Sequence, residues 1–261
     1  MFLGFDYDTS RATFFRTDAT SLAASASSSN AACATILDAV HASTNAPVLY
    51  FDGPTHVPPP DGGHRYWDGA IGGYNNPAMA GVVEALANNA TRSNIRVLSI
   101  GTGTVRRPRR PAAASLRDQL YVGGETPGLI GDFRKLAASI LDDPPDAASF
   151  VAHVQLGGRL PRARAIITDG PVVRMNPTIR PVCRDGKWQW SSAFGEETWQ
   201  KLAALDMDAV DSADVSLIRR LCDAWLRDEV PNQPVRAGDS LEAEIGHDKY
   251  SAAKAAVRKF L

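Results

Sequence analysis

The stretch Trp67-Asp68-Gly69-Ala70-Ile71-Gly72-Gly73-Tyr74-Asn75-Asn76-Pro77 constrains the fold more than any other part of this sequence. An aspartate precedes a glycine, two more glycines follow, and two asparagines and a proline lead into an apolar run. Glycine enters positive φ freely, and proline fits the first turn of a helix without losing a hydrogen bond. The order therefore predicts that the Asp68 carboxylate lies at a sharp turn with a helix beginning just behind it.

The residues that follow have a helical period. Met79, Val82, Val83 and Leu86 fall at positions i, i+3, i+4 and i+7, which predicts a helix over residues 78–89 with one apolar face. Asn76 is the expected N-cap and Pro77 the expected first-turn residue.

Length and composition indicate one soluble globular domain. The chain has 261 residues, of which 44% are hydrophobic and 22% charged, and no run of about 18 apolar residues is present. We predict a single domain over residues 1–261, with a sheet-containing part over about 1–190 and a helical part over about 191–261. The N-terminus lacks the pattern of a signal peptide, which favours a cytoplasmic protein.

Charge and cysteine content exclude several classes of function. There are 28 basic and 29 acidic residues, giving a net charge of −1, so we expect no nucleic-acid partner. Cys33, Cys183 and Cys222 are widely spaced, and we interpret them as free thiols with neither a disulfide framework nor a zinc site. No cofactor motif is found.

The remaining pattern alternates helices and strands. The predicted helices include a short one from Ile36 that Asn45-Ala46-Pro47 ends, another over 128–156 that is broken at Asp143-Pro144-Pro145, one ending near Val230, and a final one over 248–260. The expected strands are a hairpin of 2–7 with 11–17, a buried strand at 48–51, a central strand at 95–100, and a late hairpin of 165–167 with 172–175. We interpret residues 53–63 as a proline-stiffened loop. Because the run at 95–100 is apolar on both faces, the pattern predicts an α/β fold with a covered, largely parallel sheet.

These motifs together resemble the patatin-like phospholipase family. The similarity rests on Asp68-Gly69-Ala70, on Asn75-Asn76-Pro77, and on the block from His41 to Phe51 before them. Further matches to bacterial members are Leu98-Ser99-Ile100-Gly101-Thr102-Gly103, Val173-Arg174-Met175-Asn176-Pro177 and Pro231-Asn232-Gln233-Pro234-Val235-Arg236. The resemblance covers most of the chain.

The resemblance implies a three-layer α/β/α sheet, here partial, and hydrolysis of lipid acyl esters by a Ser-Asp dyad in which Asp68 is the base. Gly69, Ala70, Asn75, Asn76 and Pro77 are then the residues that support the motif. It also implies a lipid acyl-ester substrate and transient contact with a membrane surface. A carboxylate is a poor base at its ordinary pKa of about 3.9, so Asp68 must be partly desolvated to act in this way.

The sequence departs from the family at the nucleophile. No serine has glycine at both −2 and +2, and no glycine-rich loop precedes Asp68. We therefore expect the chain to be the C-terminal portion of a patatin-like domain, carrying the base without the nucleophilic serine or the oxyanion hole. One alternative is a truncated protein that binds lipid or a protein partner without hydrolysis.

A third interpretation treats His56, Asp61, His64 and Asp68 as metal ligands. Their spacing fits no zinc or calcium template, and a turn stiffened by proline explains the same residues more simply. We expect no metal site.

Overall fold

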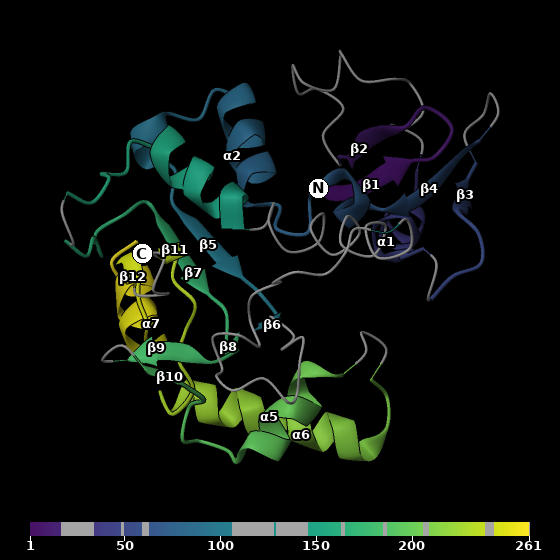
Figure 1. Cartoon of the computed structure of the whole chain (residues 1–261). Helices are drawn as coiled ribbons and strands as arrows, with labels where there is room; N and C mark the ends of the chain where they lie inside the picture. Colours follow the sequence, from purple (N-terminus) through teal and green to yellow (C-terminus); the bar gives the residue numbers. More distant parts are fainter. Residues whose placement is uncertain are drawn as a thin grey trace. The chain divides into compact units, whose positions relative to one another are not determined.

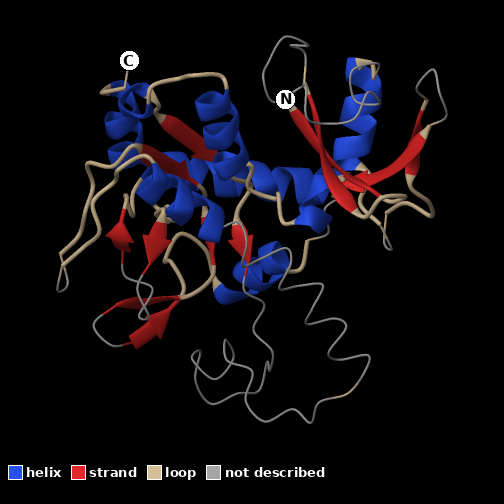
Figure 2. Ribbon diagram, turned by 90° about the horizontal axis from the view of Figure 1, so that it is seen from above, coloured by secondary structure: helices blue, strands red, loops and turns tan. Residues whose placement is uncertain are grey.

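The computed structural model describes residues 1–16, 34–47, 50–58, 63–105, 128, 146–162, 165–184, 187–205, 209–237 and 243–260. The chain divides into two compact units. The first unit holds Met1–Ile95 and Leu129–Ala152, and the second holds Arg96–Gly128 and His153–Leu261. Both contain helices and strands, so the coarse α/β class is confirmed (Figures 1 and 2). The prediction of a single domain stays a prediction.

The first unit is built on a four-stranded antiparallel sheet in the order β2-β1-β4-β3 (Figure 1). Its strands are β1 Phe2–Asp6, β2 Arg11–Phe15, β3 Thr55–Val57 and β4 His64–Asp68. The predicted hairpin of β1 and β2 is confirmed. In the centre of the sheet, Gly4 of β1 lies opposite Asp68 of β4.

Helix α1, Ile36–Thr44, packs against this sheet. A capping box begins the helix, because Thr35 Oγ1 accepts a hydrogen bond from the Asp38 amide and Asp38 accepts one from the Thr35 amide. The buried core between helix and sheet consists of Phe15, Ala39, Ala42, Val57 and Tyr66. The helix predicted from Ile36 to the Asn45-Ala46-Pro47 stop is therefore confirmed.

The loop predicted over residues 53–63 is partly wrong. Thr55–Val57 forms β3, which pairs with β4 as an edge strand. β-branched Thr55 and Val57 favour an extended chain, and Pro58 follows them where the strand ends, so the prolines interrupt no ladder. The sequence pattern missed β3 and β4 because both strands are short and lie beside prolines and glycines.

Three further elements of the first unit follow the sheet in the described part of the chain. They are the 3₁₀ turn η2 Gly69–Gly72, helix α2 Ala78–Ala87 and the 3₁₀ turn η3 Arg92–Asn94. Residues 146–155 are helical, which confirms the end of the helix predicted over 128–156, and their first seven residues belong to this unit. Residues 129–145 of that prediction, and Val48 and Leu49 of the predicted buried strand, lie outside the described residues.

The second unit contains parallel strand pairs. β5 Val97–Ile100 pairs with β7 Val172–Met175, and β6 Thr104–Val105 pairs with β8 Thr178–Ile179. The late hairpin predicted between 165–167 and 172–175 is wrong. Ile167 instead forms an isolated bridge with Ile245, and the apolar run of β5 is the partner of β7.

The described part of the second unit also contains two antiparallel strand pairs and three helices, besides the end of the helix of residues 146–155 (Figure 1). The strand pairs join β9 Val182–Arg184 with β10 Lys187–Gln189, and β11 Arg236–Ala237 with β12 Ala243–Ile245. The helices are α5 Glu196–Ala203, α6 Ser212–Leu226 and α7 Tyr250–Arg258. Helix α6 ends four residues before the expected Val230, because Asp228 takes a left-handed conformation with φ of 62°.

Two apolar clusters hold these elements together. Trp199, Leu202, Leu221, Ala224 and Val230 pack with Ile179 between α5, α6 and β8. Ala253 of α7 packs against Val173 and Met175 of β7. β5 is not covered on both faces as predicted, since Leu98 is 44% exposed and Ile100 is 70% exposed.

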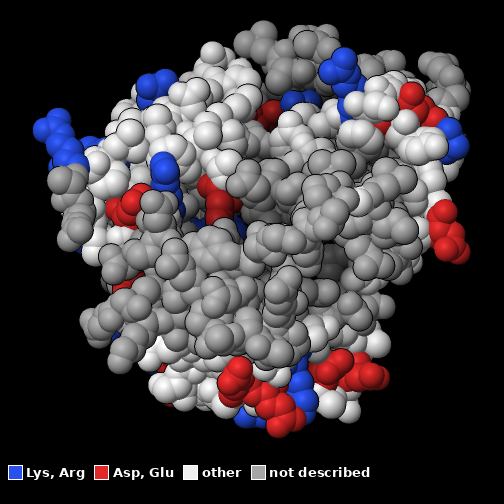
Figure 3. All heavy atoms as spheres, viewed as in Figure 1, with Lys and Arg blue, Asp and Glu red and all other residues white. Residues whose placement is uncertain are grey.

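On the face drawn in Figure 3, the described Lys and Arg residues lie among Asp and Glu residues. Among the described helices, none is both long and apolar enough to cross a bilayer.

Candidate functional site

Asp68 lies where the central strand β4 meets the turn η2. Its amide donates a hydrogen bond of 3.0 Å to the Asn45 carbonyl oxygen, at the end of α1. Its carboxylate Oδ1 accepts a hydrogen bond of 2.8 Å from the Ala70 amide, which makes Asp68 the N-cap of η2. The predicted carboxylate at a sharp turn is confirmed.

The electrostatic surroundings of Asp68 favour the protonated form more than water does. The side chain is half-buried, and desolvation raises its pKa, while the hydrogen bond from Ala70 acts in the opposite direction. Within the described part of the chain, Oδ2 accepts no hydrogen bond. One carboxylate oxygen is thus fixed, and the other is available to accept a proton.

Glycine is required beside Asp68 for a steric reason. A Cβ at Gly69 would lie 2.7 Å from the Leu3 carbonyl oxygen, so β1 leaves no space for a side chain there. Gly73 ends the turn with φ of 86°, a left-handed conformation that glycine adopts at little cost. Both glycines keep the turn tight directly after the carboxylate.

The asparagines behind the turn have different roles. Asn76 is 3% exposed, and its Nδ2 donates a hydrogen bond of 2.7 Å to Ser149 Oγ. Asn75 is exposed. The predicted N-cap of α2 is wrong by one residue, because Pro77, and not Asn76, is the N-cap. Asn76 lies one residue earlier, and its Oδ1 accepts a hydrogen bond from the Ala78 amide. Asn76 therefore ties the start of α2 to the helix of residues 146–155.

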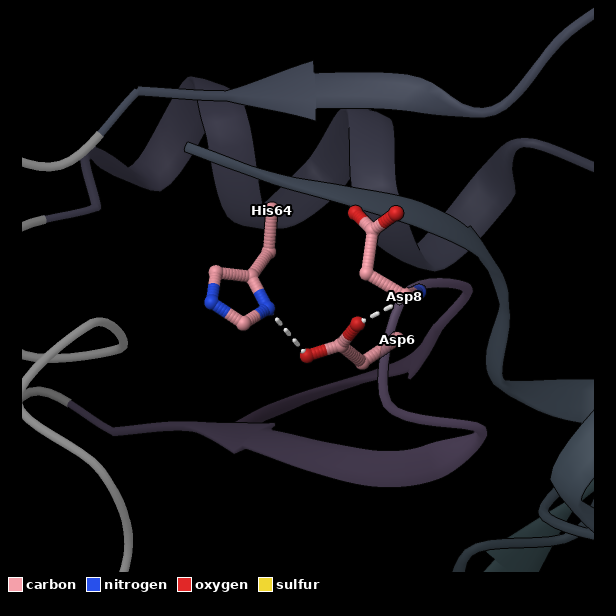
Figure 4. A group of neighbouring side chains, drawn as sticks. All are labelled: Asp6, Asp8 and His64. Carbon is pink, nitrogen blue, oxygen red and sulfur yellow. Dashed lines mark hydrogen bonds and ion pairs between the residues drawn. The ribbon is translucent and has the colours of Figure 1, made fainter. Parts of the chain in front are cut away.

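The structure also gathers two aspartates and a histidine that sequence reasoning did not group (Figure 4). Potential ligand atoms of Asp6, Asp8 and His64 lie within 4.8 Å of one another. His64 Nδ1 is 2.7 Å from Asp6 Oδ2, and Asp6 Oδ1 accepts bonds from the Asp8 and Thr9 amides. Asp8 in turn binds the Arg65 guanidinium, which lowers the pKa of the Asp8 carboxyl.

These contacts fit a structural role better than a metal site. A divalent ion would have to break the Asp6–His64 hydrogen bond and would face the positive charge of Arg65. The network instead fastens the β1–β2 turn to the start of β4. Of the four residues in the metal-ligand interpretation, His56 lies on β3, His64 and Asp68 lie at opposite ends of β4, and Asp61 is outside the described residues.

The segments 98–103, 173–177 and 231–236 come together in the second unit. Pro177 forms an isolated β-bridge with Asn232, and the Gln233 amide donates a hydrogen bond of 2.7 Å to the Asn176 carbonyl oxygen. Asn176 Oδ1 also accepts a hydrogen bond of 2.7 Å from the Gly103 amide. Ser99 is a buried strand residue whose Oγ accepts a bond of 2.6 Å from Arg174 Nη1. Its interpretation as a strand residue is confirmed.

Asn45 and Ser149 were not predicted as parts of the site. Both act through contacts that join residues distant in sequence, which no local pattern reports. Of the three cysteines, Cys222 is a free thiol on the surface.

Comparisons with protein-family models, with curated proteins and with solved structures found no match to this chain.

Proposed function

We propose that this chain carries the general base of a patatin-like lipid acyl hydrolase, with Asp68 as the aspartate of a Ser-Asp dyad. The observation that carries the proposal is the half-buried Asp68 carboxylate at the β4–η2 turn, with Oδ1 fixed by Ala70 and a raised pKa. A raised pKa makes a carboxylate a better proton acceptor near neutral pH. The three-layer α/β/α arrangement is part of the same proposal.

In the proposed reaction, Asp68 takes the proton from a serine hydroxyl as its oxygen attacks the carbonyl carbon of a lipid ester. The tetrahedral intermediate collapses to an acyl-serine, and the alcohol leaves with that proton. Asp68 then accepts a proton from water as the water oxygen attacks the acyl-serine. When the second tetrahedral intermediate collapses, Asp68 returns this proton to the serine oxygen and the fatty acid is released. No cofactor is required, and the enzyme contacts a membrane surface because its substrate resides there.

The sequence holds no Gly-x-Ser-x-Gly segment, so the proposal assigns the serine to a segment outside it. The first test reads the nucleotide sequence upstream of Met1, where we expect an in-frame strand followed by Gly-x-Ser-x-Gly. The second test compares two proteins, the 261-residue chain and the extended product, which is the protein encoded by the longer reading frame. It measures the hydrolysis of a p-nitrophenyl ester and of phosphatidylcholine vesicles by each of them.

We expect hydrolysis by the extended product alone, and a loss of at least about 100-fold in kcat with Asp68→Asn, as is typical when a general base is removed. Exposed Asp52→Asn is the control and should leave kcat unchanged. Hydrolysis that survives Asp68→Asn, in either protein, contradicts the assignment.

A second candidate function, lipid binding without hydrolysis, is supported by the start of α1. Ile36 and Leu37 are adjacent and exposed, at 67% and 63%. Flotation of the 261-residue chain with phosphatidylcholine vesicles tests it, with Ile36→Ser/Leu37→Ser as the comparison. Binding that this double substitution abolishes supports the second candidate, and absence of binding by the unchanged chain rules it out.

A further inference from the structure

Asn45 joins three segments of the first unit. It is the C-cap residue of α1 and is only 3% exposed. Its side-chain Nδ2 donates hydrogen bonds of 3.1 Å to the Tyr66 carbonyl and 3.1 Å to the Gly53 carbonyl. Its own carbonyl accepts the bond from the Asp68 amide.

Two of these bonds, those with Tyr66 and Asp68, fix the chain close to the carboxylate. The Asn45 side chain and main chain bind Tyr66 and Asp68, so the last three residues of β4 are held against the end of α1. The other edge of this segment pairs with β1, where Gly4 lies opposite Asp68. The Asp68 backbone is therefore fixed from both sides before the Ala70 amide orients Oδ1.

The chemistry of asparagine suits this position. A primary amide offers two hydrogens, and here they bind the buried carbonyl oxygen of Tyr66 and the more accessible one of Gly53. Aspartate offers no donor when ionised, and serine offers a single one. An unsatisfied buried carbonyl is unfavourable, so the loss of the side chain would loosen the carbonyls of Tyr66 and Gly53.

We propose that Asn45 is the positioning residue of Asp68: its amide holds the end of β4 so that the carboxylate stays half-buried and bound to the Ala70 amide. The catalytic meaning of this role rests on the proposed function, but the positioning does not. The prediction concerns the Asp68 carboxyl itself, and it can be measured in the chain without any hydrolysis.

The experiment is an NMR titration of the full chain that follows the Asp68 carboxyl carbon and the Ala70 amide. We expect both to report the same titration in the unchanged protein. In Asn45→Ala, water reaches the carboxylate, so the Asp68 pKa should shift down toward its ordinary value of 3.8, and the Ala70 amide should lose its response.

Two further variants keep the test decisive. Ala42→Gly loosens the same helix without removing a bond to β4, and it should leave the Asp68 titration in place. Asn45→Ser keeps one hydrogen-bond donor, so its Asp68 pKa should lie between those of the unchanged protein and Asn45→Ala. This variant replaces Asn45→Ala in the test if Asn45→Ala does not fold. An unchanged titration in Asn45→Ser, or an equal shift in Ala42→Gly, overturns the proposal.

The two proposals fail separately. If Asp68→Asn leaves hydrolysis by the extended product intact, the base assignment is lost, while the titration still decides whether Asn45 positions Asp68. If the titration is unaffected by Asn45 but Asp68→Asn abolishes hydrolysis, only the positioning role is lost.

Discussion

At the scale of single residues, Asp68 is held by atoms from three elements. β4 supplies its backbone, α1 ends at the carbonyl that binds its amide, and η2 supplies the Ala70 amide. Burial raises the pKa of its carboxyl. A residue kept ionised in such surroundings opposes folding, which gives a test independent of activity.

Asp68→Asn should stabilise the protein at neutral pH. A carboxyl whose pKa is raised on folding binds protons more tightly in the folded chain, so ionised Asp68 lowers stability at pH 7. This penalty shrinks as the pH falls through the folded pKa toward the unfolded one. We expect a free energy of unfolding higher by at most about 1 kcal/mol, since the group is half-exposed and partly screened.

Urea denaturation at pH 7 and near pH 4 measures this difference, which should be smaller at the lower pH. Asp52→Asn, at an exposed position, should change stability by no more than about 0.5 kcal/mol at either pH. A lower stability of Asp68→Asn at pH 7 would falsify the burial argument.

Gly69→Ala should destabilise the first unit by on the order of 1–3 kcal/mol, because the new Cβ would press on the Leu3 backbone of the central strand β1. Gly81→Ala is the matched control. It lies in α2 with open space around it, and alanine there should stabilise the helix by about 0.5–1 kcal/mol. Thermal unfolding of both variants gives opposite signs if the close approach of η2 to β1 is correct.

At the scale of elements, the second unit is held by a network of buried amides. Asn176 and Asn232 are both fully buried, and they join the end of β7 to residues 231–233. Asn232 Oδ1 accepts a hydrogen bond of 2.8 Å from the Asn176 amide. Its Nδ2 donates hydrogen bonds of 2.9 Å to the Arg174 carbonyl oxygen and of 2.8 Å to the His247 carbonyl oxygen. Two segments far apart in sequence thereby act as one element.

Asn176→Ala should lower the free energy of unfolding by about 1–3 kcal/mol, because it removes two hydrogen bonds, one from the Gly103 amide and one to the Gln233 side-chain oxygen. Gln200→Ala, on the exposed face of α5, should cost no more than about 0.5 kcal/mol. Chemical denaturation compares the two. Equal, small effects would mean that the amide network does not hold the unit together.

Elements with a strong local signal could be predicted from the sequence. The β1–β2 hairpin, α1, α2 and β5 each have a clear period and clear end signals. Strands β3 and β4 lack both, because they are short and lie among prolines and glycines, and they form only by pairing with each other and with β1. The predicted partner of β7 was residues 165–167, whereas the actual partner is β5. Both segments are short apolar runs, so the sequence pattern favoured the nearer one.

The candidate site divides in the same way. The turn at Asp68 followed from local backbone chemistry. Glycine is needed at position 69 for a reason other than the predicted positive φ, because Leu3 of β1 leaves no space for a Cβ. The clamp by Asn45, the bond from Asn76 to Ser149 and the pairing of Asp6 with His64 depend on tertiary contacts, so no spacing rule could reveal them.

At the scale of the whole molecule, acid should weaken the two units in different pH ranges. In the second unit, burial lowers the pKa of His247, so its stabilising neutral form is lost as the pH falls below 6.5. In the first unit, Arg65 lowers the pKa of Asp8, and that stability is lost only as the pH falls below 3.8.

Tryptophan fluorescence can separate the two responses, because Trp67 alone of the five tryptophans lies in the first unit. In Trp67→Phe, the fluorescence comes only from the second unit, from Trp188, Trp190, Trp199 and Trp225. As the pH is lowered, we expect this fluorescence to become sensitive to denaturant at a higher pH than the fluorescence of Trp67 does. His247→Gln should remove much of the change near pH 6. The same midpoint for both signals would contradict this assignment of the two groups.

The pairing of β4 with β1 also sets an order of folding. The β1–β2 hairpin needs only a short turn, whereas Asp68 meets Gly4 only after the long intervening chain has closed. The carboxylate acquires its buried surroundings at that step, and before it Asp68 is an ordinary solvated residue. A nascent or partly unfolded chain therefore lacks the half-buried carboxylate that we propose as a base, and this carboxylate is formed together with the completed sheet.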